Sequence, residues 1–196
     1  QRVELNGASL AYREKRIRPG LDDKTLTSWN ALMSKGLIDA YVVTKNERWL
    51  ELATQNLNFL TSQQMTSDGK LWHNFKGNKS NINAYLEDYA LLIDALIRYY
   101  EVTLDTTTLP KIKKLTEYVF GHFEQAPSGM FYFKSKLDPE LVSKKAEITD
   151  NVIPASNSVM ATNLYKLGLI LEDGDLIELS KTQLAQVESS FSQYPG

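Results

Sequence analysis

Hydrophobic residues along the chain fall into helical segments of two alternating kinds. The first kind is apolar around most of the helix circumference, which predicts helices enclosed on nearly all sides; it covers residues 28–43, 83–102 and 156–171. The second kind has a single apolar stripe and follows each of the first, at residues 47–65, 109–124 and 175–190. Only an inner helix can be covered on all sides, so the alternation predicts two concentric layers of helices.

The pattern therefore predicts an all-α fold with about three helical hairpins in a single domain, residues 1–196. The hairpin units are expected at about 25–82, 83–155 and 156–196. Two architectures fit this repeat, an (α/α) toroid and an open solenoid of stacked hairpins. The nearly all-apolar leading helices favour the toroid, here a partial (α/α) barrel.

The connections between the predicted helices differ in length in a regular way. Links from a leading to a trailing helix are short, whereas the links at 66–82 and 125–155 are long. Each long link contains a glycine turn followed by an aromatic run, at 67–73 and 128–133, which predicts short β-strands in the outer-to-inner loops. Long loops in compact domains are usually functional. Because these links lead to the N-terminal ends of the inner helices, we expect a site there.

A polar motif precedes the first inner helix and runs from Arg18 to Asn30. Asp and Thr before a helix satisfy its free N–H groups, but capping accounts for only one or two of these residues. Asp22 and Asp23 are therefore candidate catalytic carboxylates. The candidate substrate-binding residues of this motif are Arg18, Lys24, Trp29 and Asn30.

A second motif, Tyr85-Leu-Glu87-Asp88-Tyr89, lies in the first turns of the second inner helix. Two carboxylates in an otherwise apolar helix must be paired, hydrogen-bonded or exposed to a wet cavity, because burying an isolated charge is costly. Glu87 and Asp88 point about 100° apart and cannot both serve one helix cap. Both are candidate catalytic residues, and Tyr85 and Tyr89 are candidate substrate-binding residues.

A third motif surrounds the start of the third inner helix, from Asp150 to Ser158. Its serines are good helix caps, whereas Asp150 is a candidate catalytic residue and Asn157 a candidate substrate-binding residue. Trp72 and His73, in the first long link, are further candidate substrate-binding residues.

Composition excludes several classes of function. The 22 basic and 24 acidic residues are spread along the chain, so we expect no nucleic-acid partner and no membrane partner. The absence of cysteine excludes disulfides and a cysteine nucleophile. No metal-ligand spacing or phosphate-binding loop is present, so we predict no metal and no cofactor. No apolar run is long enough for a membrane span and residues 1–10 lack a signal-peptide pattern, which favours a cytoplasmic protein.

The three motifs together resemble a family that joins a thioredoxin-like domain to a six-hairpin barrel and includes the spermatogenesis-associated thioredoxin-like proteins. The residues that carry the resemblance are Arg18-Pro19, Asp22-Asp23-Lys24, Leu26 to Met33, Leu86-Glu87-Asp88-Tyr89-Ala90, Asp150-Asn151, Pro154 and Ser156-Asn157-Ser158. The resemblance implies a toroid of the six-hairpin glycosidase type, of which this chain is a middle-to-late fragment. It also implies two partners in the full protein, the remaining barrel hairpins and a thioredoxin-like domain.

The barrel of that family is similar to N-acylglucosamine 2-epimerases and cellobiose epimerases, and more distantly to glycosidases. Those enzymes transfer protons with histidines on inner helices, and the sequence departs from that pattern because neither His73 nor His122 lies on a predicted inner helix.

We therefore expect a carbohydrate-binding or carbohydrate-active barrel segment whose ligand is a small molecule of the sugar class. Aromatic residues would stack on the sugar, and two carboxylates would act as acid and nucleophile or base if the reaction is hydrolytic. The alternative is a non-catalytic module that presents a ligand or protein to the thioredoxin-like domain. A half toroid leaves apolar edges uncovered, so the chain is also expected to self-associate or to show an exposed apolar patch.

Overall fold

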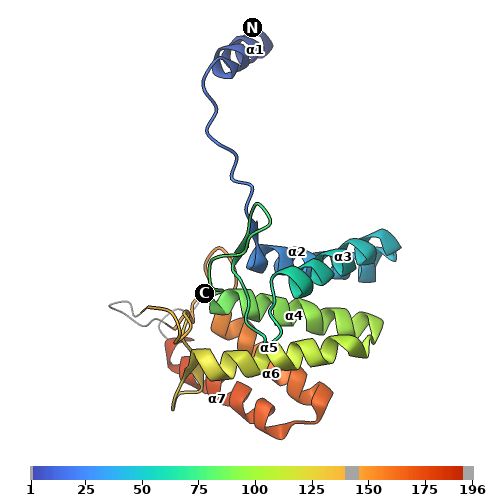
Figure 1. Ribbon diagram of the computed structural model, residues 1–196, viewed down its shortest axis with the longest axis vertical. Helices are drawn as coiled ribbons and strands as arrows, with labels where there is room; N and C mark the ends of the chain where they lie inside the picture. The colour runs from blue at the N-terminus through green and yellow to red at the C-terminus, as the bar shows by residue number, and fades with distance from the viewer. Residues whose placement is uncertain (1, 140–145, 192–196) are drawn as a thin grey trace.

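The computed structural model describes residues 2–139 and 146–191, which form three helical hairpins preceded by a separate helix (Figure 1). The hairpins pair α2 (Thr27–Thr44) with α3 (Glu47–Gln63), α4 (Leu86–Thr103) with α5 (Leu109–Phe123), and α6 (Ser156–Leu171) with α7 (Gly174–Phe191). The six helices predicted from the hydrophobic pattern are all present, with ends that differ from the prediction by at most three residues.

The helices form two layers. In the inner layer α4 packs between α2 and α6, and in the outer layer α3, α5 and α7 each pack against the inner helix of their own hairpin. Figure 1 shows this arc, together with α1 (Arg2–Glu14), which stands away from the hairpins at the end of an extended segment. None of the helices in the described part of the chain is long and apolar enough to cross a bilayer.

Each inner helix ends in the same way. Lys45, Leu104 and Glu172 follow the last turns of α2, α4 and α6 in the left-handed conformation, with φ of 56°, 57° and 56°. In each case the backbone N–H of this residue donates to the carbonyl four residues earlier, which satisfies one of the free carbonyls of the helix end. This repeated cap produces the short links that the sequence predicted.

Short strands stiffen the long links. β1 (Thr25–Leu26) pairs with β2 (Asn74–Phe75), and β3 (Glu124–Gln125) pairs with β4 (Met130–Phe131), both antiparallel. The strand predicted within 67–73 begins later than expected, since Leu71 and Trp72 make only isolated bridges. A single 3₁₀ turn, η1 (Thr106–Thr108), fills the link between α4 and α5.

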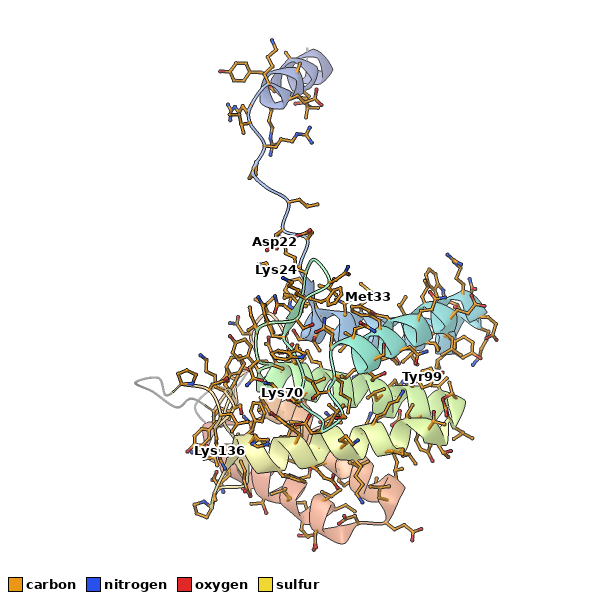
Figure 2. All side chains as sticks on the ribbon, viewed as in Figure 1. Asp22, Lys24, Met33, Lys70, Tyr99 and Lys136 are labelled. Carbon is orange, nitrogen blue, oxygen red and sulfur yellow. The ribbon has the colours of Figure 1, made fainter. Side chains whose placement is uncertain are left out.

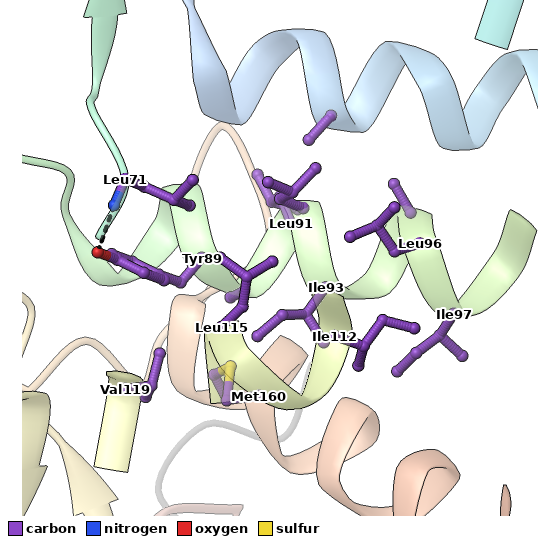
Figure 3. Packing of buried hydrophobic residues seen from close by; sticks show 14 of the residues in the cluster. Leu71, Tyr89, Leu91, Ile93, Leu96, Ile97, Ile112, Leu115, Val119 and Met160 are labelled. Atoms are coloured by element: carbon purple, nitrogen blue, oxygen red, sulfur yellow. Dashed lines mark hydrogen bonds between the residues drawn. The ribbon is translucent and has the colours of Figure 1, made fainter. Parts of the chain in front are cut away.

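The core lies around α4. Its side chains from Asp88 to Ile97 are buried, and they contact α2 above and α5 and α6 below in the view of Figure 3. Tyr89 belongs to this core, where its hydroxyl accepts the backbone N–H of Leu71 at 2.8 Å (Figure 3). Each large apolar side chain buried here contributes about 1.5–3 kcal/mol, which makes α4 the main source of stability.

Only α4 is enclosed as the sequence predicted for every inner helix. On α2, Trp29 and Met33 are 61% and 62% exposed, and on α6, Tyr165 and Leu169 are 46% and 56% exposed. The prediction is wrong for α2 and α6 because each has an inner-layer neighbour on one side only. The expected exposed apolar surface at the edges of a partial barrel is confirmed.

Candidate functional site

The inner helices begin at the same end of the arc, where the long links also arrive. A buried carboxylate joins two of these helix ends, since Asp88 of α4 accepts the backbone N–H of Ser28 in the first turn of α2 at 2.9 Å. We name the residues around this contact, Ser28, His73, Glu87 and Asp88, the mouth cluster.

Asp88 is fully buried and uses both carboxylate oxygens. Its Oδ1 accepts from Ser28, and its Oδ2 accepts from the backbone N–H of Tyr85 at 2.9 Å and lies 2.9 Å from Nδ1 of His73. The bond to Tyr85 caps α4, because Tyr85 is the residue before the helix. Asp88 is therefore the positioning residue of the mouth cluster.

His73 reaches the cluster from the long link between α3 and α4. Its backbone is held by Thr27 of α2, whose N–H donates to the His73 carbonyl at 2.9 Å, and its ring packs edge-on against Tyr85 at 5.0 Å. The hydrogen bond to Asp88 raises the pKa of His73, and burial of the ring opposes this rise. A carboxylate oxygen accepts hydrogen bonds, so Nδ1 of His73 carries the hydrogen of its contact with Asp88 Oδ2. Nε2 of His73 has no hydrogen-bond partner within residues 2–139 and 146–191.

Glu87 is half-buried beside this pair. Burial raises the pKa of its carboxyl, and the negative charge of Asp88 raises it further, while the nearby His73 and the Ser28 hydroxyl act in the opposite direction. The Ser28 oxygen is buried and makes no hydrogen bond of good geometry within the described residues. The cluster thus pairs a carboxyl whose pKa is raised with an imidazole whose Nε2 has no hydrogen-bond partner among the described residues.

The three ionisable residues are close enough to hold a cation. One ligand-type atom from each of His73, Glu87 and Asp88 lies within 4.8 Å of the others, a proximity that the sequence spacing did not indicate. However, Nδ1 of His73 and both oxygens of Asp88 are already engaged in hydrogen bonds. The geometry therefore supports proton transfer better than metal binding.

An aromatic wall stands next to the cluster. Tyr85 stacks on Phe133 with ring centroids 5.1 Å apart and planes 10° apart, and the ammonium of Lys134 lies 5.8 Å from the Tyr85 ring. Tyr85 is partly exposed, so its substrate-binding role stays a prediction.

Two predicted catalytic carboxylates do not belong to the cluster. Asp22 and Asp23 are exposed and form ion pairs with Lys24 at 3.1 Å and with Lys76 at 2.5 Å. These lysine contacts lower the pKa of both carboxyls, so both stay ionised. Figure 2 shows Asp22 and Lys24 at the base of the extended segment that leads from α1. The catalytic role predicted for Asp22 and Asp23 gains no support from these contacts and stays a prediction, whereas Lys24 is near enough to influence the pKa of His73.

Three further candidate residues make packing or hydrogen-bond contacts within the fold. Tyr89 is fully buried and stacks on Tyr118, so it has no free face for a sugar. The Asn157 amide exchanges hydrogen bonds with the backbone of Phe131 in β4, at 2.9 and 3.0 Å. The Asn30 amide donates to the Leu26 carbonyl at 2.8 Å. These contacts explain Tyr89, Asn157 and Asn30 as structural residues, and their predicted substrate-binding roles stay predictions.

The remaining candidates lie on separate elements of the structure. Trp29 is exposed on α2, Trp72 lies beneath the ammonium of Lys70 at 4.4 Å, and Arg18 lies on the exposed segment before β1. Asp150 accepts the backbone N–H of Ala155 at 2.8 Å and lines a separate hollow of about 560 Å³ between α6 and α7. Asp150 thus stabilises the turn before α6, and its predicted catalytic role stays a prediction.

Sequence reasoning missed Glu147. Its carboxylate accepts from the Ser156 hydroxyl at 2.7 Å and the Ser156 N–H at 3.3 Å, so it caps α6, and its charge also raises the pKa of Glu87. The third motif did predict a carboxylate ahead of α6, but it selected Asp150, three residues away. Phe133 was also missed as a site residue, although the aromatic run that contains it was recognised.

Known proteins match this chain both in sequence and in fold. An uncharacterised protein of Caenorhabditis elegans is 31% identical over 170 residues, which cover 82% of this chain and 23% of the relative. Human spermatogenesis-associated protein 20 is 27% identical over 165 residues, which cover 79% of this chain and 21% of the relative. This chain thus spans less than a quarter of the length of these relatives. No protein-family model matches it.

The fold is similar to solved carbohydrate-enzyme structures. A GH76 α-mannanase of Bacteroides thetaiotaomicron superposes with a TM-score of 0.69 at 17% identity, covering 90% of this chain and 46% of the mannanase. A cellobiose 2-epimerase of Bacillus thermoamylovorans superposes with a TM-score of 0.66 at 19% identity, covering 83% of this chain and 44% of the epimerase. The predicted (α/α) toroid of the six-hairpin glycosidase type is confirmed. The homologues of the chain include spermatogenesis-associated protein 20, which confirms the resemblance carried by its motifs.

Proposed function

We propose that this chain supplies the proton-transfer half of a sugar site, in a barrel that interconverts sugars by an epimerase or isomerase type of reaction. The observation that supports this proposal is the pairing of His73 with Asp88 next to Glu87 at the end of the inner helices. The fold similarity to a cellobiose 2-epimerase agrees with it.

The chemistry follows from the two open groups of the mouth cluster. Nε2 of neutral His73 would remove the proton from the carbon next to the carbonyl of an open-chain sugar, while neutral Glu87 donates its proton to the carbonyl oxygen. The resulting enediol regains a carbon-bound proton from the His73 imidazolium, and the Glu87 carboxylate takes back the hydroxyl proton. His73 returns the proton only to the face from which it was removed, so inversion of that carbon requires a second proton donor on the opposite face, which further hairpins of the barrel would supply. Asp88 stabilises the imidazolium and fixes the tautomer.

A hydrolytic reaction between two carboxylates has less support. It requires two carboxyl groups about 5–5.5 Å apart for retention or about 6.5–9.5 Å apart for inversion, each available to the sugar. Asp22, Asp23 and Asp150 are engaged elsewhere, and Asp88 and Glu147 serve helix ends. Glu87 alone among these carboxylates remains available.

Recognition of the sugar would rest on the residues around the cluster. The exposed side of Tyr85, backed by Phe133, offers a flat apolar face, and Lys24, Arg18, Trp29 and Trp72 are exposed or partly exposed candidates for further contacts. In this proposal residues 1–196 form one partial-barrel domain. The other walls of the site would come from further hairpins, and the thioredoxin-like domain implied by the resemblance would be a neighbouring partner.

The proposal is tested by hydrogen exchange between sugar and solvent. The protein is incubated in D₂O with mannose, glucose, N-acetylglucosamine or cellobiose, and deuterium at C2 is measured by NMR. We expect exchange with at least one of these sugars, and a loss of about 100-fold or more in His73→Gln, since one acid–base group contributes about 10²–10⁴-fold.

Lys76→Gln is the matched control, because Lys76 lies in the same long link but pairs with Asp23 on the surface. Its exchange rate should equal that of the unsubstituted protein. Saturable sugar binding without exchange would favour the non-catalytic binding module instead. If none of the sugars binds and none exchanges hydrogen, both the epimerase-type reaction and the non-catalytic binding module are overturned.

A further inference from the structure

Lys134 occupies a defined place at the start of α4, through a contact that the first hairpin also makes. In the first hairpin the N–H of Thr27, the first residue of α2, donates to the carbonyl of His73 at 2.9 Å. In the second hairpin the N–H of Leu86, the first residue of α4, donates to the carbonyl of Phe133 at 2.9 Å. Phe133 is therefore the counterpart of His73 in the next link, and Lys134 follows it directly.

The backbone is held on both sides of Lys134. The carbonyl before it is bonded to the first turn of α4, and after it the N–H of Lys136 donates to the carbonyl of His122 in α5 at 2.7 Å. Ser135, between these two anchors, is buried. Lys134 therefore extends from a fixed segment rather than from a free loop.

The charge of Lys134 has no counter-charge in the described part of the chain. Its side chain is partly buried, and its ammonium makes no ion pair within residues 2–139 and 146–191, where its contact is with the Tyr85 ring at 5.8 Å. Partial burial disfavours the charged form of a lysine, and a cation at this distance from an aromatic ring gains little. By contrast, Lys24 and Lys76, which flank β1 and β2, both pair with aspartates. Lys134 is thus available to an anionic group of a ligand.

Lys134 and His73 lie beside the same aromatic ring. The His73 ring centre is 5.0 Å from that of Tyr85, and the Lys134 ammonium is 5.8 Å from it. One sugar molecule placed along Tyr85 can therefore contact His73 with one end and Lys134 with the other. The buried carboxylate of Asp88 is bonded to His73, so an anionic group of the sugar would be repelled from the His73 end and attracted to the Lys134 end.

We propose that the sugar bound at the mouth cluster is acidic, with its carbonyl end at His73 and an anionic group at its far end bound by Lys134. This inference rests on the proposed function for the direction in which the sugar lies. One lysine matches the single charge of a carboxylate, whereas a phosphate is commonly held by several donors. A hexuronate is therefore the expected class of substrate, and a sugar 6-phosphate has the same chemistry at that end.

The test compares sugars that differ only at C6. Glucose, glucuronate and glucose 6-phosphate form one series, and mannose, mannuronate and mannose 6-phosphate form the other. Binding is measured by isothermal titration calorimetry, and deuterium exchange at C2 is measured by NMR. We expect the acidic members of at least one series to bind and exchange about 10- to 150-fold better than the neutral member, the range for one charge-assisted hydrogen bond.

Substitution of Lys134 tests whether this residue causes the preference. Lys134→Met keeps the length of the side chain without its charge, and the ratio of acidic to neutral sugar should fall to near one. Lys134→Arg should retain most of the preference, because it keeps the charge. Lys136→Met is the matched control, since Lys136 is exposed on the same link (Figure 2) and only its backbone is bonded to α5. Its ratio should equal that of the unsubstituted protein.

The outcomes separate this inference from the proposed reaction. Equal binding of acidic and neutral sugars, or a preference that survives in Lys134→Met, would overturn the acidic substrate and leave the reaction standing. Uronate binding that depends on Lys134 but brings no exchange would support the anion site and overturn the reaction. A stronger preference for the 6-phosphates would support the anion site and identify phosphate as its ligand. Binding of none of the six sugars would overturn the inference, provided that circular dichroism shows the protein to be folded.

Discussion

His73 donates a hydrogen bond from Nδ1 to Oδ2 of Asp88 at 2.9 Å, and this contact joins a long link to the first turn of α4. The same carboxylate caps α4 and holds the first turn of α2. One buried residue therefore fixes both the helix ends that frame the site and the tautomer of the imidazole within it.

Asp88→Asn should strongly destabilise the protein. The amide nitrogen of Asn cannot accept a hydrogen bond, so at least one of the donors on Ser28, Tyr85 and His73 loses its partner inside the protein. We expect the free energy of unfolding to fall by about 3 kcal/mol, the scale for breaking a buried charged contact. Urea denaturation followed by circular dichroism measures this change.

Asp22→Asn is the control for that measurement. Asp22 also contacts a cationic side chain, but both partners are exposed, and surface ion pairs contribute little to stability. Its urea midpoint should match that of the unsubstituted protein. An equal loss of stability in the two variants would mean that the burial of Asp88 does not determine its contribution to stability.

The stability of the protein should depend on pH through His73. Asp88 raises the folded-state pKa of His73 above its unfolded value of about 6.5, so the protonated ring stabilises the folded state. This contribution is fully present below the unfolded pKa and is lost as the pH rises through the folded pKa. The stability difference between the protein and His73→Gln should therefore be largest in mild acid and shrink toward alkaline pH.

An NMR titration of the His73 ring checks the same relationship directly. Its midpoint should lie above the value for a free histidine side chain and should drop in Asp88→Asn, because that substitution removes the charge that raises it. A midpoint that does not respond to the substitution would contradict the assigned hydrogen bond.

Glu87→Gln should stabilise the protein at neutral pH. Burial and the charge of Asp88 raise the folded-state pKa of Glu87, so the contribution of this residue to stability is greatest below its unfolded pKa and is lost as the pH rises. A neutral amide removes that penalty, and the urea midpoint should rise at pH 7 while differing little near pH 4, about the unfolded pKa of Glu. The same variant should lose deuterium exchange into the sugar, since it no longer donates a proton.

Glu101→Gln provides a matched comparison on the same helix. Glu101 pairs with Arg98 at 3.1 Å and with Lys166 at 3.4 Å, so its charge is compensated and the amide should bring no gain in stability. If both variants behaved alike, the effect of Glu87 would reflect only the overall charge of the protein.

The helices of this fold were predictable, whereas the site was predictable only in part. Periodicity fixes which residues of a helix share a face, and the separation of Glu87 and Asp88 by about 100° correctly indicated that one could cap α4 while the other does something else. His73 was assigned to the site, but its contact with Asp88 depends on the path of the link held by β1 and β2. Glu147 lies on an irregular segment without a repeat, so nothing in the pattern distinguished it from Asp150.

Tyr89→Phe should lower stability without changing the site. The Tyr89 hydroxyl accepts the buried N–H of Leu71 at 2.8 Å, and its removal leaves that N–H without a partner, at a cost of about 1–3 kcal/mol. Because Tyr89 lies in the core rather than at the mouth, the titration of His73 should stay unchanged. A shifted titration would restore Tyr89 as a site residue.

Two helical glycines should respond to alanine in opposite directions. Alanine is favoured over glycine inside helices by about 0.8–1.0 kcal/mol, so helix propensity alone predicts a gain at both Gly121 and Gly168. At Gly121 of α5 an added Cβ meets no atom within 4 Å, and Gly121→Ala should raise the free energy of unfolding by about that amount.

At Gly168 of α6 the Cβ would lie 2.7 Å from Ile177 Cγ1 and 2.9 Å from the Asp173 carbonyl oxygen. The backbone atom cannot rotate away, so α7 must shift and the overpacking cost of about 1–3 kcal/mol exceeds the propensity gain. Urea denaturation of both variants should show Gly121→Ala above the unsubstituted protein and Gly168→Ala below it; a gain at both positions would mean that α6 and α7 pack less closely than described.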